Sequence, residues 1–441
     1  MTRTTRLWRS LAVVGVASLV LSACGGDGDA SDDETGGNGT TETDEPAAEN
    51  TYDPAAGDPA MTIGTLLPES GSLSFLGPPM TTGAQLAAQD VNEAGGLDGA
   101  PIALSAADEG DANLNIVGQS AAGLLNQGVS AILGAAATGM SQLVYSQITG
   151  AGVLQISPSN TGVEVSTWDT GGLYFRTAPS DVLQGEVLGQ VILEDGHESV
   201  GILYLDSPYG AGLSETVAST VEAGGVEVVY NQAFSEAAES YSAEASALAA
   251  ADPDAIVVIS YDQIYSIIPE LANNFDDLSN LYLVDGNTKD FSVGPTEGSP
   301  GLAEGIVEGA QGTIPGQSTE GSEFGDRLLE ITPNLDSYTY AGEAYDAIIL
   351  VSLAAIQAGA TDGASIAAEM VDVSGGGGEK CEVFHECKAL IEAGEDIDYD
   401  GVSGPVEWAP NGDPQSAFIG LYQFGADNVP EFQEARTLDV E

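Results

Sequence analysis

Short apolar runs alternate along this chain with longer amphipathic stretches, beginning at Met61. The runs have the length of strands but lack strict apolar–polar alternation, as is typical of parallel strands that are covered on both faces. The stretches between them repeat apolar residues at the spacing of a helix. We therefore predict a doubly wound α/β lobe, with strands at 61–67, 101–107, 129–133 and 153–156 and helices at 83–94, 113–127 and 140–149.

The same alternation starts again after the segment Tyr174–Pro179 and predicts a second α/β lobe. Its expected strands are 199–205, 226–230, 255–259 and 281–284, and its expected helices are 181–194, 210–223, 243–250 and 263–273. A further strand is predicted at 305–314, followed by an apolar helix at 340–358. This helix has more apolar surface than the second lobe can accept, so we expect the chain to cross between the lobes.

The first residues have the pattern of an export signal. Three arginines precede eleven uncharged, mostly apolar residues at 11–21, a run too short to span a bilayer, and small residues then precede Cys24. This order resembles that of bacterial lipoproteins. It predicts a signal peptide at 1–23, cleavage before Cys24, lipidation of Cys24, and anchoring to the outer face of the cytoplasmic membrane. The alternative, a buried cysteine after a core helix, leaves the basic start unexplained.

Acidic residues dominate the rest of the chain. Residues 24–60 hold many acids, no base and few large apolar side chains, which predicts a disordered tether. The whole chain carries 68 Asp and Glu against nine Lys and Arg, a formal charge of −59. That field repels nucleic acid, so we exclude it as a partner. Acidic surfaces poor in lysine are typical of proteins from saline environments, which we take as a hypothesis about habitat.

Two further cysteines stand close together, at Cys381 and Cys387. Outside the cytoplasm this spacing favours a disulfide that closes a small loop. The alternative is a metal site with His385, but that set lacks a fourth ligand. We expect a disulfide, and neither a metal nor a cofactor.

Several motifs occur in the order and spacing of a known family. They are Ile63–Gly71, Gly83–Ala87, Val91–Gly96, Ile156–Thr161, Tyr174–Asp181, Tyr209–Gly212 and Tyr340–Ala347. Together they resemble the leucine/isoleucine/valine-binding (branched-chain amino acid) family of ABC-transporter substrate-binding proteins, from Met61 to about Asp427. The resemblance implies the type I periplasmic-binding fold, in which two Rossmann-like α/β lobes, joined by three crossing segments, close on a ligand. It places lobe 1 at 61–178 plus about 312–404 and lobe 2 at 179–311 plus about 405–441.

Candidate ligand contacts in the first lobe follow two predicted strands. An amino acid needs anion donors for its carboxylate, and in a chain with so few bases these should come from the backbone. The turn 134–139 opens a helix, whose free N–H groups favour an anion. The resemblance places Ala137, Thr138, Ser159 and Thr161 where the family grips the α-carboxylate and α-ammonium. Family members often have serine at Ala137, so a hydroxyl contact must come from Thr138. A tight turn and a helix cap are the alternative readings of these segments.

The second lobe supplies three candidates that also follow strands: Tyr209, Tyr261 and Asp285. We expect the rings to cover the ligand and Asp285 to pair with its ammonium group. The alternative for Asp285 is a solvated loop acid. Leu76 stands where branched-chain-binding relatives often have an aromatic side chain against the ligand, which leaves the ligand's identity open.

These observations predict an extracytoplasmic solute-binding lipoprotein that delivers an amino acid, of branched-chain type or related, to an ABC permease and its ATPase. The sequence has no phosphate-binding loop, nucleophile elbow or metal-ligand cluster, so we expect no enzyme. Two alternatives remain. The same fold could bind amides, urea-like solutes or aromatic acids, or it could sense a ligand for a separate signalling partner.

Overall fold

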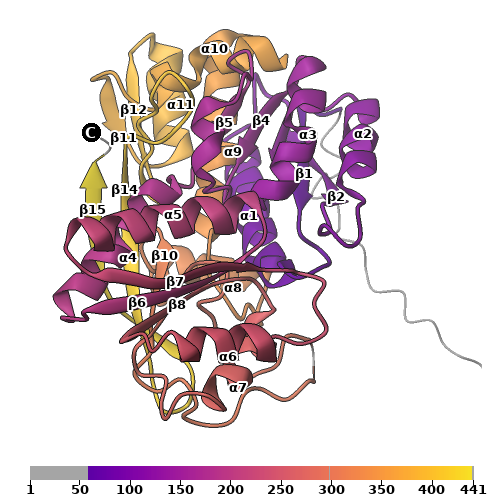
Figure 1. The fold of residues 1–441 in the computed structure, drawn as a ribbon. Coiled ribbons are helices and arrows are strands. Elements are labelled where there is room, and N and C mark those ends of the chain that lie inside the picture. The colour runs from indigo at the N-terminus through magenta and orange to yellow at the C-terminus, as the bar shows by residue number, and fades with distance from the viewer. Residues whose placement is uncertain (1–57, 297, 440–441) are drawn as a thin grey trace, which may run out of the picture. The chain divides into compact units, whose positions relative to one another are not determined.

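Parallel strands dominate the computed structural model, which describes residues 58–296 and 298–439. The predicted signal peptide, Cys24 and nearly all of the predicted tether lie outside those residues. The first sheet is entirely parallel and has the order β2-β1-β3-β4-β5 (Figure 1). Its strands are β1 (Met61–Leu67), β2 (Ile102–Asp108), β3 (Ala131–Gly134), β4 (Leu154–Ser157) and β5 (Tyr174–Arg176).

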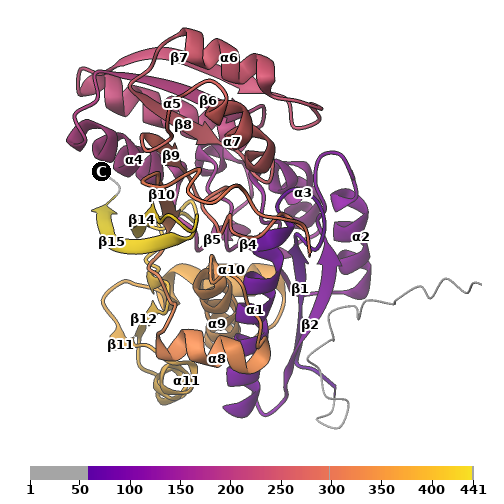
Figure 2. The same ribbon diagram turned by 90° about the horizontal axis from the view of Figure 1, so that it is seen from below.

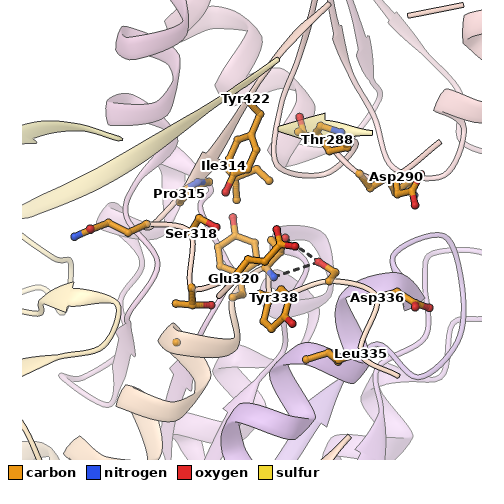
Figure 3. A pocket seen from close by; sticks show the side chains of 18 of the residues that line it. Thr288, Asp290, Ile314, Pro315, Ser318, Glu320, Leu335, Asp336, Tyr338 and Tyr422 are labelled. Atoms are coloured by element: carbon orange, nitrogen blue, oxygen red, sulfur yellow. Dashed lines mark hydrogen bonds between the residues drawn. The ribbon is translucent and has the colours of Figure 1, made fainter. Parts of the chain in front are cut away.

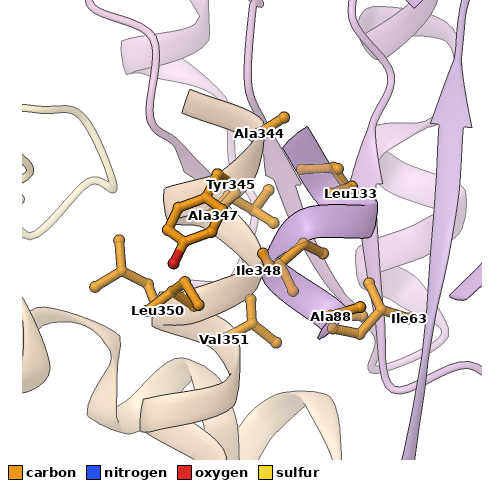
Figure 4. Close-up of a cluster of buried hydrophobic side chains, with 14 of the residues drawn as sticks. Ile63, Ala88, Leu133, Ala344, Tyr345, Ala347, Ile348, Leu350 and Val351 are labelled. Carbon is orange, nitrogen blue, oxygen red and sulfur yellow. The ribbon is translucent and has the colours of Figure 1, made fainter. Parts of the chain in front are cut away.

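Helices cover both faces of this sheet. Helices α1 (Gly77–Glu93) and α9 (Ala341–Ala358) pack on one face, and α2 (Val117–Gln127) and α3 (Thr138–Gly150) on the other. Figure 4 shows the α9 face, where Ile348 and Val351 lie with Ile63 and Leu133 of the sheet. Helix α9 is long and apolar enough to cross a membrane, but 83% of it is buried here, which identifies it as a core helix.

The second sheet has seven strands in the order β15-β14-β10-β9-β8-β6-β7. The five from β6 to β10 are parallel to their neighbours, and an antiparallel hairpin extends one edge. Its strands are β6 (Ser199–Leu205), β7 (Glu227–Phe234), β8 (Ala255–Ile259), β9 (Leu281–Leu283), β10 (Gln311–Pro315), β14 (Ser416–Phe424) and β15 (Pro430–Asp439). Figure 2 shows this sheet with its helices beside the first.

Alternate residues of the second sheet pack on opposite layers of helices. In β8, Ile256 and Val258 pack with α6 (Ser242–Ala250) and α7 (Ile264–Ala272), whereas Val257 and Ile259 pack with α4 (Asp181–Glu194) and α5 (Pro208–Ala223). Because each successive side chain points to the other face, a strand buried on both sides must be apolar throughout. This is why the pattern of apolar runs predicted these strands.

The chain passes between the two sheets three times: after β5, between β10 and α8 (Glu323–Ile331), and between β13 (Gly404–Pro405) and β14. The segment between the second and third passages returns to the first sheet, where α9 packs on α1. The lobe boundaries predicted at 61–178 plus 312–404 and at 179–311 plus 405–441 stay a prediction.

A small third sheet lies within that returning segment. It consists of β11 (Glu379–Cys381), β12 (Ile397–Gly401) and β13, and it accompanies α10 (Gly363–Val373) and α11 (Phe384–Ala393). Cys381 and Cys387 form a disulfide that links β11 to α11. The predicted disulfide is therefore confirmed, and the described residues contain no cluster of His, Cys, Asp and Glu that could hold a metal ion.

The predicted elements agree best where apolar runs are buried on both faces. Strands 61–67, 199–205 and 255–259 and helix 181–194 coincide with the observed bounds. The strand predicted at 305–314 is wrong in its first half, because Gly305 and Gly309 adopt positive φ angles of 73° and 86° in turns, and β10 begins only at Gln311.

Candidate ligand-binding site

All eight side chains predicted to contact a ligand lie around one small cavity. They reach it from loops at the carboxyl ends of parallel strands of both sheets, the usual ligand position in α/β folds. The cavity volume is about 10 Å³, close to the least that one water molecule requires. It is lined by Leu73, Leu76, Ala136, Ala137, Thr138, Ser159, Thr161, Tyr209, Tyr261, Asp285 and Gly286.

The turn after β3 is shaped by its backbone. Gly134 has a φ of 113°, and a Cβ there would lie 1.9 Å from the carbonyl oxygen of Leu66, so only glycine fits. The N–H groups of Ala136 and Ala137 donate to the carboxyl group of Glu109, at 2.5 and 3.0 Å. Burial raises the pKa of Glu109 to about 8, although these hydrogen bonds act in the opposite direction.

The position of Glu109 changes which backbone N–H groups of this turn are available to a ligand. The N–H of Ala137, which we expected to face a ligand carboxylate, is bonded to Glu109. The first residue of α3 is Thr138, whose N–H has no acceptor within the helix. Thr138, which lines the cavity, therefore offers its N–H and its hydroxyl to a ligand.

The segment after β4 is held in place by Ser157. Its hydroxyl donates to the carbonyl oxygen of Ala135 at 2.7 Å and accepts from the N–H of Asn160 at 3.0 Å. Ser159 is exposed by only 8%, and its hydroxyl has no hydrogen-bond partner among the described residues. A buried hydroxyl without a partner is costly, so Ser159 is a group that a ligand can satisfy.

Asp285, after β9, is the centre of a cluster of tyrosines. Its two carboxylate oxygens accept from the hydroxyls of Tyr209 and Tyr340, each at 2.7 Å. The rings of Tyr209 and Tyr261 stack with centroids 5.4 Å apart. Burial raises the pKa of Asp285, and the hydrogen bonds from the two tyrosines partly offset that rise. Asp285 is thus a buried acid and not the solvated loop acid of the alternative interpretation.

A second acid, Asp181, lies beside this cluster. It is the first residue of α4, it is fully buried, and neither carboxylate oxygen has a hydrogen-bond partner among the described residues. Burial, followed by the negative charge of Asp285, raises the pKa of Asp181. A ligand ammonium group close to both carboxyl groups would offset the cost of burying their negative charge.

Contacts between loops of the two sheets close over the cavity. Tyr340, at the start of α9, bonds to Asp285; the hydroxyl of Ser72 donates to Glu236 at 2.6 Å, and the N–H of Asp262 donates to the Ser72 carbonyl at 3.2 Å. An amino acid is far larger than the cavity that remains. Entry of a ligand therefore requires these contacts to separate, as in hinge opening.

Arg176 does not line the cavity. Its fully buried guanidinium donates to Asp413 at 2.7 Å and to the carbonyl oxygens of Asn160 and Gly162 at 3.2 and 2.9 Å. It thereby fixes the loop that carries Ser159 and Thr161 to the segment that precedes β14.

Sequence reasoning missed three residues of this site: Glu109, Asp181 and Tyr340. Signals for them were present. Glu109 stands two residues after the strand predicted at 101–107 and directly after the observed β2. Asp181 and Tyr340 both lie in the motifs that carry the family resemblance. The sequence did not show that Tyr340 turns toward Asp285, because its φ of 61° is rare for an aromatic residue.

Two doubly wound lobes that meet over a cavity at their strand ends define a bilobal solute-binding protein. The family model for the periplasmic binding protein matches residues 60–419, and the chain belongs to that family. The expected fold class, two α/β lobes of type I, is confirmed. The family is extracytoplasmic, which agrees with the expected location at that coarse level.

Named relatives support the predicted branch of the family. BasB, a substrate-binding protein of a chemotactic signal transduction system in Halobacterium salinarum, is 27% identical, over 82% of this chain and 87% of BasB. Leu/Ile/Val-binding protein homolog 3 of Brucella melitensis is 25% identical, over 70% of this chain and 82% of that protein. The resemblance to the leucine/isoleucine/valine-binding family is confirmed, and these relatives are named as binding proteins.

A solved structure supports the fold. LivJ of Streptococcus pneumoniae, a branched-chain amino acid transporter substrate-binding protein crystallised with isoleucine, superimposes with a TM-score of 0.67. The sequences are 22% identical, and the superposition covers 86% of this chain and 99% of LivJ.

Proposed function

We propose that this protein is an extracytoplasmic solute-binding lipoprotein of an ABC import system. It captures an amino acid, of branched-chain type or related, between its two lobes and delivers it to a permease and ATPase. One observation carries the proposal: loops of both sheets bring hydrogen-bonding groups and the buried acid Asp285 around a single cavity. A second buried acid, Asp181, lies close enough for the charge of Asp285 to act on it.

The groups around the cavity match the two charged ends of an amino acid. The N–H and hydroxyl of Thr138, with the hydroxyls of Ser159 and Thr161, offer donors to the carboxylate. Asp285 and Asp181 offer negative charge to the ammonium group. Leu73 and Leu76 are the apolar side chains that line the cavity, so they are the part of the wall that suits an apolar ligand side chain.

Capture and release follow from motion between the lobes. In the proposed division, residues 61–178 and 312–404 move as one body and residues 179–311 and 405–441 as the other. Ligand contacts on both sides of the cavity favour the closed arrangement, and a ligand shifts the equilibrium by its difference in affinity for the two states. Cleavage before Cys24 and lipidation of Cys24 would keep this cycle beside the permease.

Calorimetric titration of the full-length chain with leucine, isoleucine, valine, acetamide, urea and benzoate tests the proposal. We expect at least one α-amino acid to bind. Asp285→Asn should weaken that binding by roughly 10- to 100-fold, because a hydrogen bond to a charged group is lost. Asp276→Asn, at an exposed acid outside the cavity, is the matched control and should change nothing. Binding confined to solutes without an ammonium group, unaffected by Asp285→Asn, would contradict the assignment.

A sensory role is the second candidate, and the relative BasB favours it because that protein is named for chemotactic signal transduction. The two roles separate in cells. If the protein feeds a permease, deletion of its gene should abolish uptake of the labelled ligand. If it serves a separate signalling partner, uptake should persist while the cellular response to the ligand disappears.

A further inference from the structure

A second, larger cavity lies behind Tyr340. Its volume is about 320 Å³, and Figure 3 shows its walls, with Thr288 and Tyr422 on one side and Glu320 and Tyr338 on the other. The lining comes from loops after β9 and β10, from β14, and from the segment that leads into α9. A cavity of this size can hold the side chain of an amino acid.

Tyr340 touches both cavities. It lines the larger one, and its hydroxyl donates to Asp285, which lines the smaller one. Its backbone is in the left-handed region, with a φ of 61°, which costs about 1 kcal/mol or more for a bulky residue. Tyr340 also packs in the core beside the first sheet, so its ring separates the two cavities, and a rotation of that ring would connect them.

The buried carboxyl groups on α9, the helix that follows Tyr340, differ in their partners. Asp346 accepts hydrogen bonds from Tyr399, Val402 and Ser403, and is fully satisfied. Glu343, one turn earlier, lines the larger cavity and is exposed by only 5%, yet no other described residue donates to its carboxyl group. An acid buried without donors is costly unless something else pairs with it.

The surroundings of Glu343 are shaped to hold its carboxyl group in place. A Cβ at Gly316 would lie 2.5 Å from Glu343 Oε1, so the glycine, with a φ of 92°, leaves the room that this oxygen occupies. The hydroxyls of Thr288 and Thr319, also in the wall, are buried without hydrogen-bond partners among the described residues. Several groups that accept hydrogen bonds thus face one polar cavity.

The charge of the cavity wall is negative. Asp290, Glu320, Asp336 and Glu343 line it, against one base, Lys289. The ammonium group of Lys289 is paired with Asp262 and lies 3.8 Å from the centroid of the Phe75 ring, so its charge is already engaged. The cavity therefore suits a group that is positively charged and donates hydrogen bonds.

We propose that the larger cavity binds the cationic end of an elongated amino acid, with Tyr340 moving aside and Glu343 pairing with the cation. This inference rests on the proposed function, because the α-amino and α-carboxylate groups of the ligand stay in the smaller cavity. Amino acids with a long basic side chain are then related ligands of this receptor: their aliphatic part contacts Leu73 and Leu76, and their cationic end reaches the larger cavity.

Lysine and norleucine provide the test, because they differ only in the terminal ammonium group. In calorimetric titrations of the full-length chain, lysine should bind at least tenfold more tightly than norleucine. Glu343→Gln should reduce the ratio of the lysine affinity to the norleucine affinity to nearly one. Glu343→Asp, which keeps the carboxyl group, should retain part of this preference for lysine. Glu330→Gln, at an exposed acid on α8 outside both cavities, is the matched control and should leave the ratio unchanged.

The outcomes separate this inference from the function on which it rests. If norleucine binds as tightly as lysine, or if Glu343→Gln keeps the full ratio, the cationic subsite is wrong while the receptor stands. If no α-amino acid binds the wild-type chain, both are wrong. Circular dichroism and thermal melting show whether each variant is folded, so that a loss of the preference for lysine can be told apart from unfolding.

Discussion

At the scale of single residues, buried acids around the cavities differ in how many donors reach them. Asp285 and Glu109 each accept two hydrogen bonds, whereas the two buried oxygens of Asp181 have no partner among the described residues. Glu343, exposed by 5%, faces the larger cavity instead of a donor. The two hydroxyls that donate to Asp285 position its carboxylate, and because a carboxylate has about four acceptor sites, it can still pair with a ligand. A buried acid with few hydrogen-bond donors destabilises the folded state. A role in ligand binding would account for its presence.

Glu343→Gln gives a pH-dependent change in stability that follows from this cost. Burial raises the pKa of Glu343 from 4.5 to about 8, and the nearby Asp346 adds to the rise. The unfolded chain therefore releases the proton at lower pH than the folded one, and wild type loses stability as the pH rises from about 4.5 to 8. Glutamine has no charge to bury, so the variant should be more stable at pH 8, by roughly 1–3 kcal/mol.

Urea denaturation of both chains at several pH values measures this difference. We expect it to be smallest near pH 4.5 and to level off above pH 8. Comparison of variant with wild type at each pH cancels the titration of the other acids. If the difference in free energy of unfolding between the variant and the wild type does not vary with pH, the raised pKa of the Glu343 carboxyl group is wrong.

The candidate site could be predicted residue by residue only where strand ends supply the side chain. Asp285 and Tyr261 follow apolar runs, and parallel strands bring such positions to one edge. The partners of those residues could not be predicted. That Glu109 takes the N–H groups of Ala136 and Ala137, and that Tyr340 turns toward Asp285, depend on loop geometry that no spacing in the sequence encodes.

At the scale of elements, α9 is tied to the third sheet by a single acid. Asp346 accepts from the hydroxyl of Tyr399 at 2.7 Å and from the N–H groups of Val402 and Ser403 at 3.1 and 2.8 Å. These bonds fix the loop between β12 and β13 to α9. The position of the loop between β12 and β13 therefore depends on a contact with a buried residue of α9.

Replacement of Asp346 should be among the most destabilising changes at a polar residue. Asp346→Ala leaves several buried donors without an acceptor and should cost about 3–5 kcal/mol. Tyr399→Phe removes one donor and should cost only about 1 kcal/mol. The midpoint of urea unfolding measures both. Equal effects of the two changes would show that the network around Asp346 is not satisfied as described.

The helices and strands that could be predicted from the sequence are those that are most buried. Strands β1, β6 and β8 are buried on both faces and appear in the sequence as unbroken apolar runs. The hairpin of β14 and β15 was missed, because β15 (Pro430–Asp439) lies at a sheet edge and is mostly polar and exposed along residues 431–437. An edge strand with a solvated side lacks the signal that identifies a central one.

At the scale of the whole molecule, charge is the dominant feature. The formal charge of −59 leaves the chain with strong repulsion among its acids. Within residues 58–296 and 298–439, every Lys and Arg pairs with an acid, such as Arg327 with Asp90 and Arg436 with Glu194. Dissolved cations must therefore screen most of the acids.

The melting temperature should rise with salt for this reason. Between 0.05 and 2 M NaCl we expect an increase of roughly 5–10 °C, because the Debye length falls to about 3 Å at 1 M. Calorimetric scans at fixed pH measure it. An equal osmolality of sucrose is the control, since it changes surface exclusion without screening charge. A melting temperature that stays constant with NaCl would remove the hypothesis of a saline habitat.

The glycine at the end of β3 has a consequence for how this protein can change over evolutionary time. Because Gly134 admits no side chain, the turn that presents Thr138 cannot be remodelled at its origin. New ligand preferences must instead arise at side chains that project into the cavities, such as Leu76, Tyr340 and Glu343. Selection for a new nutrient would change the residues at those positions while the turn stays constant. Mutant libraries designed to alter ligand specificity should therefore vary those three positions.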